Sequence, residues 1–227
     1  MKKQVYHGRA ILILFIVVFL IPSHKAVSQI ENFNGLPQFL FPEFSASKVK
    51  MKAGKDLNLL LNYNLITEKM VFFQKDQVYD MLNQGVVDTI YMSGSKFVPN
   101  EKVFYEAHPG VPVSLFVQHK GRIMAPPRPA AYGGTSEVSS STYITRMELG
   151  SQVYNMKLEG DLRVKYDPMY WVRFNDQMYS FNNEKQYLKV FTGKEEVLKQ
   201  FIKKNRLKFE KPIDLLKIWR YTNEVVK

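Results

Sequence analysis

The feature that most constrains the fold is an alternation of apolar and polar side chains that begins at Lys48. From residue 48 to 52 lysines alternate with Val49 and Met51, and from residue 57 to 65 mainly leucines alternate with asparagines. Successive side chains of a strand point to opposite faces, so the pattern predicts strands with one buried and one solvated face. Ala53-Gly54-Lys55-Asp56 is typical of a turn. The sequence therefore predicts an antiparallel hairpin over 48–65.

Short segments of the same kind recur along most of the chain. We expect 113–118 and 122–125 to pair across a turn at His119-Lys120-Gly121. Prolines and small polar residues over 126–141 predict a loop or linker. It separates an N-terminal β-rich section, 29–125, from a second β-meander, 142–191. The other predicted strands are 70–73, 78–82, 88–92, 102–107, 143–149, 153–158, 162–166, 170–174, 177–181 and 186–191.

Two pairs of segments resemble each other. The stretch 51–57 (MKAGKDL) resembles 156–162 (MKLEGDL), and 75–79 (KDQVY) resembles 175–179 (NDQMY). Two related β-meanders would explain the similarity, and so would chance among many short strands.

The period changes near the C-terminus, where 192–227 predicts a basic helical pair. Thr192 and Glu195 have the spacing of a capping box, and an apolar stripe at helical spacing follows. A second helix is expected near Pro212, because proline suits the first position of a helix. The predicted fold class is α+β: a mostly antiparallel β-sheet or meander with a C-terminal helical pair packed on it.

The N-terminus has the layout of a secretory signal peptide over 1–28. Lys2, Lys3 and Arg9 precede an apolar run over 10–21, and a short polar stretch ends in Ala26-Val27-Ser28. The apolar run is shorter than a comfortable membrane span, although an uncleaved N-terminal anchor is the alternative. We expect an exported protein of the periplasm, of the outer-membrane surface or of the medium, with no membrane span after cleavage.

The mature chain contains no cysteine, which excludes a disulfide framework and a lipid-modified N-terminal cysteine. Its stability must come from burial, and apolar residues are plentiful, since they make up 45% of the full sequence. The aromatic residues of the proline-bracketed connector 29–44 are expected to pack onto the domain.

The mature chain's excess positive charge lies at its C-terminal end. Residues 29–184 are neutral, whereas 185–227 contain twelve Lys/Arg and five Asp/Glu. This predicts an anionic partner, such as lipopolysaccharide, phospholipid headgroups or an acidic protein, and no nucleic acid. A solvated helix face is the simpler interpretation. The candidate contacts are Lys199, Lys203, Lys204, Arg206 and Lys208.

No familiar catalytic or metal-binding motif occurs, and no cofactor is expected. After signal removal the histidines are His108 and His119, both predicted to lie in exposed turns. Ser-x-x-Lys spacing occurs at 45–48 and 93–96, but without the other motifs of penicillin-interacting enzymes. The acid pairs nearest to a glycosidase arrangement are Glu159 with Asp161 and Asp76 with Asp80. Aromatic residues over 166–181 could stack on sugars or peptides, although a core role is the simpler expectation.

Several segments together resemble uncharacterised secreted proteins typical of Bacteroidota. The resemblance implies a Gram-negative envelope location and brings no activity or site residues. The segments are GLPQFLFPEF (35–44), VKMK (49–52), LLNYN (60–64), EKMVF (68–72), VDTI (87–90), YLK (187–189), IKKN (202–205) and DLL (214–216).

From these patterns we expect a non-enzymatic envelope protein that acts by binding. The alternatives are a hydrolase of glycan or peptide polymers in the envelope and, since short aromatic strands recur, an outer-membrane β-barrel. The predicted C-terminal helix argues against the barrel.

Overall fold

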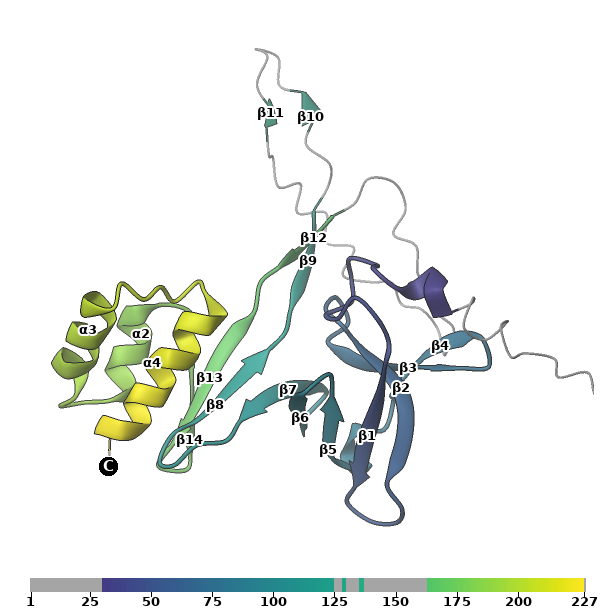
Figure 1. Cartoon of the computed structure of the whole chain (residues 1–227), viewed down its shortest axis with the longest axis horizontal. Coiled ribbons are helices and arrows are strands. Elements are labelled where there is room, and N and C mark those ends of the chain that lie inside the picture. The colour runs from purple at the N-terminus through teal and green to yellow at the C-terminus, as the bar shows by residue number, and fades with distance from the viewer. Residues whose placement is uncertain (1–29, 125–127, 130–134, 137–162, 227) are drawn as a thin grey trace, which may run out of the picture.

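The computed structural model describes residues 30–124, 128–129, 135–136 and 163–226 (Figure 1). The predicted signal peptide, the predicted strands 143–149 and 153–158, and most of the predicted linker lie outside these residues. The strands are β1 (Ser45–Met51), β2 (Leu57–Asn64), β3 (Lys69–Gln74), β4 (Gln77–Asp80), β5 (Val87–Met92), β6 (Ser95–Asn100), β7 (Val103–His108), β8 (Ser114–Gln118), β9 (Gly121–Met124), β10 (Arg128–Pro129), β11 (Thr135–Ser136), β12 (Arg163–Tyr166), β13 (Met169–Phe174) and β14 (Gln177–Phe181).

Ten of these strands form one antiparallel sheet in the order β14-β13-β8-β7-β6-β5-β1-β2-β3-β4. The predicted hairpin over 48–65 is confirmed, because β1 pairs with β2 with Lys48 opposite Asn58. Strand β6 was not predicted, since the proline and polar residues of SKFVPN disturb the alternation. Strands β13 and β14, from the second β section, join the same sheet as β1 to β8.

Two hairpins share a turn geometry that explains one of the internal similarities. Lys75-Asp76 joins β3 to β4 and Asn175-Asp176 joins β13 to β14, and all four residues have φ between 50° and 60°. Left-handed residues at both central positions are the mark of a type I′ turn, which matches the twist of the strands it joins. The resemblance of 75–79 to 175–179 is therefore a shared hairpin turn. The other similar pair involves 156–162, outside the described residues.

The bent sheet encloses one apolar core, and the aromatic residues of the connector pack into a second apolar cluster. Fully buried side chains from β1, β2, β5, β6 and β7, including Tyr63 and Phe97, face one another inside the bend. On the other side of β3 and β4, Phe39 and Phe44 of the connector pack against Val71 and Val78. The expectation that these connector aromatics pack onto the domain is confirmed.

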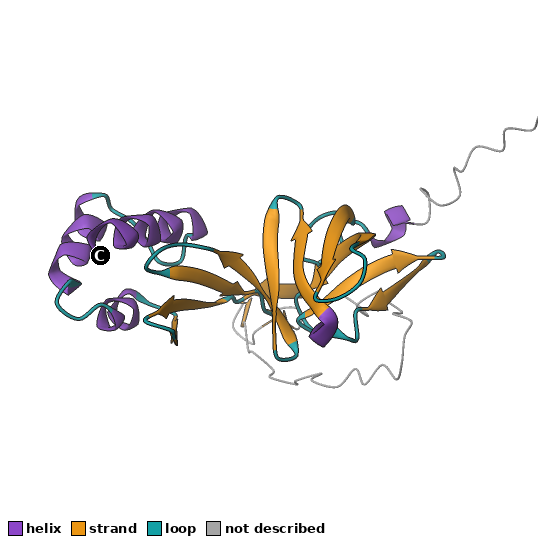
Figure 2. Ribbon diagram, turned by 90° about the horizontal axis from the view of Figure 1, so that it is seen from below, coloured by secondary structure: helices purple, strands orange, loops and turns teal. Residues whose placement is uncertain are grey.

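Three helices cover the other end of the sheet, so the predicted α+β class is confirmed. They are α2 (Glu184–Val190), α3 (Glu195–Lys204) and α4 (Pro212–Val225), and they lie together beside β8, β13 and β14 (Figures 1 and 2). Leu198, Ile202, Leu215 and Ile218 pack with inward side chains of these strands. Tyr187 from α2 is fully buried in the same cluster, and its hydroxyl bonds to Thr222 Oγ1 of α4 at 2.7 Å.

Two predictions about this helical end are wrong. Residues 186–191, predicted as a strand, lie mostly in α2, which the Asn183 side chain caps by accepting a hydrogen bond from the Gln186 amide. The predicted capping box at Thr192 does not form, since α3 begins at Glu195 after Lys194, which makes no side-chain cap. The helix start at Pro212 is confirmed.

The predicted hairpin across His119-Lys120-Gly121 is also wrong. Strand β8 pairs with β13, and β9 pairs with β12 in a separate two-stranded sheet. The segments β8–β9 and β12–β13 therefore form one long ribbon with a break at residues 119–120 opposite 167–168. The Asp167 amide donates to the Lys120 carbonyl across this break at 2.8 Å.

Candidate functional site

The five cations predicted to contact an anionic partner lie at the end of α3 and in the loop that follows it. All five side chains are exposed, and within the described part of the chain none of them forms an ion pair. Lys199 and Lys203 are one turn apart on one side of α3, while Lys204 lies about 100° further round the helix. Arg206 and Lys208 follow in the loop to α4. The structure thus gathers them around one helix end, and not along a single stripe.

Arg206 has an unusual backbone conformation for its residue type. The Leu207 amide donates to the Ile202 carbonyl at 3.0 Å, and the Arg206 amide donates to the Lys203 carbonyl at 3.2 Å. This is the Schellman ending of a helix, and its left-handed position usually holds glycine. Arg206 occupies that position with φ 52°. An L-residue there costs about 1–2 kcal/mol relative to glycine.

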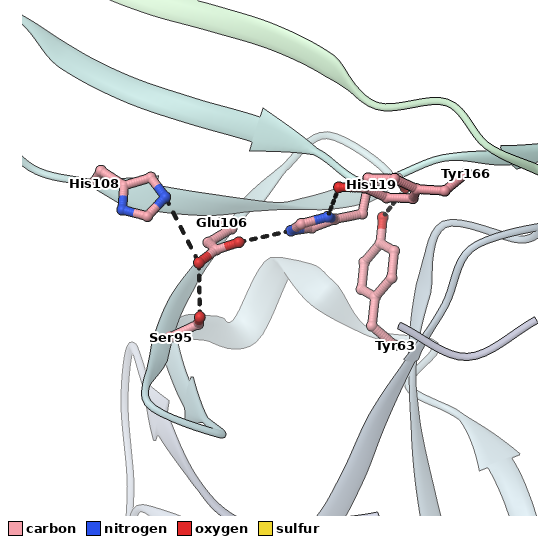
Figure 3. A network of polar contacts seen from close by, with 6 residues as sticks. All are labelled: Tyr63, Ser95, Glu106, His108, His119 and Tyr166. Atoms are coloured by element: carbon pink, nitrogen blue, oxygen red, sulfur yellow. Dashed lines mark hydrogen bonds and ion pairs between the residues drawn. The ribbon is translucent and has the colours of Figure 1, made fainter. Parts of the chain in front are cut away.

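A network of polar side chains lies where β7 meets the break in the long ribbon (Figure 3). The Glu106 carboxylate accepts hydrogen bonds from Ser95 Oγ at 2.7 Å and from His119 Nε2 at 2.8 Å. His108 Nε2 lies 3.6 Å from the same carboxylate. The other ring nitrogen of His119, Nδ1, lies 2.7 Å from the Tyr166 hydroxyl. The network therefore connects β6, β7 and β12.

The prediction that both histidines lie exposed in turns is wrong. His119 is only 5% exposed, and His108 is the last residue of β7 with a partly buried side chain. Because a carboxylate can only accept, the hydrogen bond to Glu106 assigns a proton to His119 Nε2. In the neutral ring Nδ1 then accepts from the Tyr166 hydroxyl, so every polar atom of the ring has a partner.

Burial and hydrogen bonding act in opposite directions on the network's ionisable groups. Burial raises the pKa of Glu106, but the hydrogen bonds from His119 and Ser95 and the nearby histidines outweigh it, and its pKa lies below the ordinary value. Burial lowers the pKa of His108, against the attraction of Glu106. Burial is also the main reason why the pKa values of Tyr63 and Tyr166 are raised. The network therefore favours an ionised carboxylate beside neutral phenols.

Further contacts fasten the ribbon's break to the β2–β3 hairpin. The Gly121 amide donates to the Leu65 carbonyl at 2.8 Å, and the Tyr63 hydroxyl donates to the His119 carbonyl at 3.1 Å. Glu68 pairs with Lys120 at 3.3 Å and accepts from the Gln118 side chain. The network is thus part of a clamp that holds the ribbon against the body of the sheet.

The connectivity of this network has one parallel with nucleophilic catalysis. Tyr166, His119 and Glu106 stand in the order hydroxyl, base and orienting acid. However, a phenol nucleophile needs a lowered pKa, and the pKa of Tyr166 is raised. The Ser95 hydroxyl contacts Glu106 and not the imidazole, so serine and histidine are not arranged as nucleophile and base. The geometry accounts for a structural clamp more directly than for a reaction.

The other candidates for chemistry lack the required arrangement. In both Ser-x-x-Lys segments the residues lie in or beside strands, and in β1 Ser45 and Lys48 point to opposite faces because they are three apart. Asp80 is held by Lys69 at 2.9 Å, while Asp76 lies in a hairpin turn. Glu159 and Asp161 fall outside the described residues.

The aromatic residues predicted over 166–181 divide between the core and other roles. Tyr170 and Phe181 are buried in the cluster under the helices, with Phe174 and Tyr179 packed against it. The expected core role is therefore confirmed for these four residues. Trp171 points to the opposite face and stacks on Tyr105 with ring centroids 5.9 Å apart.

No family model, curated protein or solved structure matches the chain. Among the described residues no group of three or more histidines and acids is placed to hold a metal ion. None of the helices described is long and apolar enough to cross a membrane.

Proposed function

We propose that the protein is a non-enzymatic binding protein of the cell envelope that engages an anionic partner through the end of α3. The observation that carries the proposal is the cluster of Lys199, Lys203, Lys204, Arg206 and Lys208, all exposed and, among the described residues, without an ion pair. Unpaired cations on one end of a molecule create a local field that attracts anions and orients them toward that end.

Helix electrostatics explains only part of this cluster. Cations in the last turn of a helix offset its dipole, which accounts for Lys203 and Lys204. Arg206 and Lys208 lie beyond the helix, and Arg206 occupies a position where glycine would be more stable. A residue that lowers local stability while adding an exposed charge supports a role in binding.

The test measures binding to vesicles that contain an anionic phospholipid and to lipopolysaccharide at low salt. The variant combines Lys203→Gln, Lys204→Gln and Arg206→Gln. Each basic residue near an anionic surface contributes about 1 kcal/mol, so the triple variant should bind about a hundredfold more weakly. The matched control replaces Lys185, Lys189 and Lys194 by glutamine. These three side chains are exposed, so the control removes the same amount of charge from other positions.

A single substitution separates binding from folding. Arg206→Gly should raise stability by about 1 kcal/mol because it relieves the left-handed conformation, while it weakens binding. A structural role alone predicts the gain in stability without the loss of binding. The proposal fails if the parent protein binds neither surface at low salt, or if the triple variant and its control bind equally.

A further inference from the structure

A second surface, on the outer face of the bent sheet, brings cations around an exposed aromatic ring. Lys48 of β1 lies opposite Tyr91 of β5, and Tyr91 lies opposite Lys96 of β6. Directly opposed residues of antiparallel strands share a face, so the three side chains form one row. Lys50 lies next to this row on β1, with Nζ 5.9 Å from the centre of the Tyr91 ring. We call Lys48, Lys50, Tyr91 and Lys96 the Tyr91 face.

The inner residues of the same strands confirm which way this face points. Val49, Ile90 and Phe97 alternate with the row and are fully buried in the core inside the bend. The Tyr91 face therefore points outward, and Tyr91 itself is 42% exposed although it is a large aromatic side chain. Strand pairing on both sides holds the row at a spacing of about 4.8 Å between strands.

Asp56 compensates part of the positive charge of this face, since Lys48 and, to a smaller extent, Lys50 lower the pKa of its carboxyl. Lys48 pairs with Asp56 of the β1–β2 turn at 3.1 Å, a contact between exposed groups. In the part of the chain that the structure describes, Lys50 and Lys96 form no ion pair. The distance of Lys50 from the ring is at the outer limit of a cation–π attraction, so its ammonium can turn toward a ligand at little cost.

We propose that the Tyr91 face binds an acidic polysaccharide. A sugar unit presents C–H bonds that are attracted to the negative face of an aromatic ring, and its carboxylate pairs with an ammonium beside that ring. A row of strands offers both groups side by side and at fixed spacing, which suits an extended polymer. This surface lies on different elements from the cluster at the end of α3, so the two proposals stand on separate observations.

The test is retention of the full mature protein in native gels that contain polygalacturonate, compared with gels that contain neutral dextran. Tyr91→Ala should abolish most of the retention, Tyr91→Phe should keep it, and Lys50→Gln with Lys96→Gln should reduce it at least tenfold. The control is Lys185→Gln with Lys189→Gln, which removes the same charge from exposed positions of α2. Circular dichroism and a thermal melt check that each variant is folded.

Two further comparisons decide whether the acidic polymer binds at the Tyr91 face or at the α3 cluster, and whether the face prefers sugars to other polyanions. The variant with Lys203, Lys204 and Arg206 replaced by glutamine should keep its retention on polygalacturonate, because those residues belong to the α3 cluster. If that variant loses retention while Tyr91→Ala keeps it, the acidic polymer binds at α3 and the Tyr91 face is excluded as its site. Equal retention of Tyr91→Ala and the parent protein, or stronger retention on single-stranded DNA than on polygalacturonate, would overturn the proposal.

Discussion

Replacement of Glu106 by glutamine is the sharpest test of the buried network. Glutamine keeps the shape of the side chain but replaces a charged acceptor by an amide. Its oxygen can still accept from Ser95, whose hydroxyl lies 2.7 Å from the carboxylate. Its NH₂ group then faces His119 Nε2, so the imidazole must carry its proton on Nδ1, where the Tyr166 hydroxyl accepts it, for Nε2 to accept from the amide. The substitution therefore removes the charge-assisted hydrogen bond from His119.

The magnitude follows from these contacts. A hydrogen bond to a charged group contributes about 1.5–3 kcal/mol, and the Glu106 side chain is well shielded from solvent, with 16% exposed. We expect Glu106→Gln to lower the free energy of unfolding at pH 7.5 by about 2–3 kcal/mol. For a chain of this size that corresponds to a fall in Tm of roughly 5–10 °C. Glu43→Gln, at an exposed position, is the matched control and should change little.

The pH dependence gives the same prediction a second readout. Because the pKa of Glu106 is lowered in the folded protein, its stabilising effect is complete above the ordinary pKa of 4.5 and is lost as the pH falls through the lower folded value. The difference between parent and variant should therefore persist from pH 7.5 to about 4.5 and shrink below it. His108, whose pKa burial lowers, makes both proteins less stable below about pH 6.5.

Urea unfolding followed by tryptophan fluorescence at pH 7.5, 5 and 3.5 measures these differences. A loss below about 0.5 kcal/mol at pH 7.5 would refute the assigned hydrogen bonds, since that is the range of ordinary surface substitutions. A loss that stays constant from pH 7.5 to 3.5 would refute the ionised state of Glu106.

Three further substitutions test other parts of the fold by thermal and urea unfolding. Leu198→Ala removes a fully buried side chain from the core under the helices and should cost about 2–5 kcal/mol, and a cost below 1 kcal/mol would show that α3 does not pack there. Gly121→Ala places a methyl group 2.7 Å from Val164 Cγ1 and 2.9 Å from Leu65 Cβ, so it should cost about 1–3 kcal/mol, and a neutral result would contradict the close approach of β9 to the β2–β3 hairpin. Asp176→Gly should stabilise the protein by about 1 kcal/mol, since φ is 60° at this position, whereas destabilisation would argue against the type I′ turn.

The strands were predictable where one face is buried and the other is solvated. The alternation from Lys48 onward predicted β1 and β2 with their turn, because burial of one face imposes a period of two on the sequence. The start of α4 was predictable from Pro212, whose missing amide hydrogen makes no difference at a helix start. These features depend on residues close together in the chain.

Helix α2 was not predictable in this way, because its sequence fits the pattern of a strand as well as that of a helix. Residues 186–191 alternate well enough for a strand, but Asn183 caps a helix there and Tyr187 fills the space between β14 and α4. A signal was present in the Asn183–Gln186 spacing, which resembles a capping box with asparagine as its first residue. The preference for helix also depends on the core that only the folded sheet provides.

The buried network around His119 was not predictable from the sequence either. His119, followed by lysine and glycine, has the local sequence of an exposed turn, and nothing near it indicates Glu106 or Tyr166 as partners. Tyr166 lies 47 positions away and meets His119 because β9 pairs with β12. Glu106 lies 13 positions away and meets it because β7 pairs with β8, with Glu106 opposite Val117. Hydrogen bonds of a buried imidazole are satisfied by whichever groups the topology brings within reach.

The chain by itself thus determined the strand-rich class, the helical C-terminus and the location of the excess positive charge, since each is a property of neighbouring residues. Only the tertiary structure decided that the strand after His119 continues the ribbon and does not turn back, that this histidine is buried against a carboxylate, and that Lys48, Tyr91 and Lys96 share a row. The physical reason is that local periodicity specifies which faces are buried, whereas the order of strands in a sheet depends on long-range pairing that no short segment encodes.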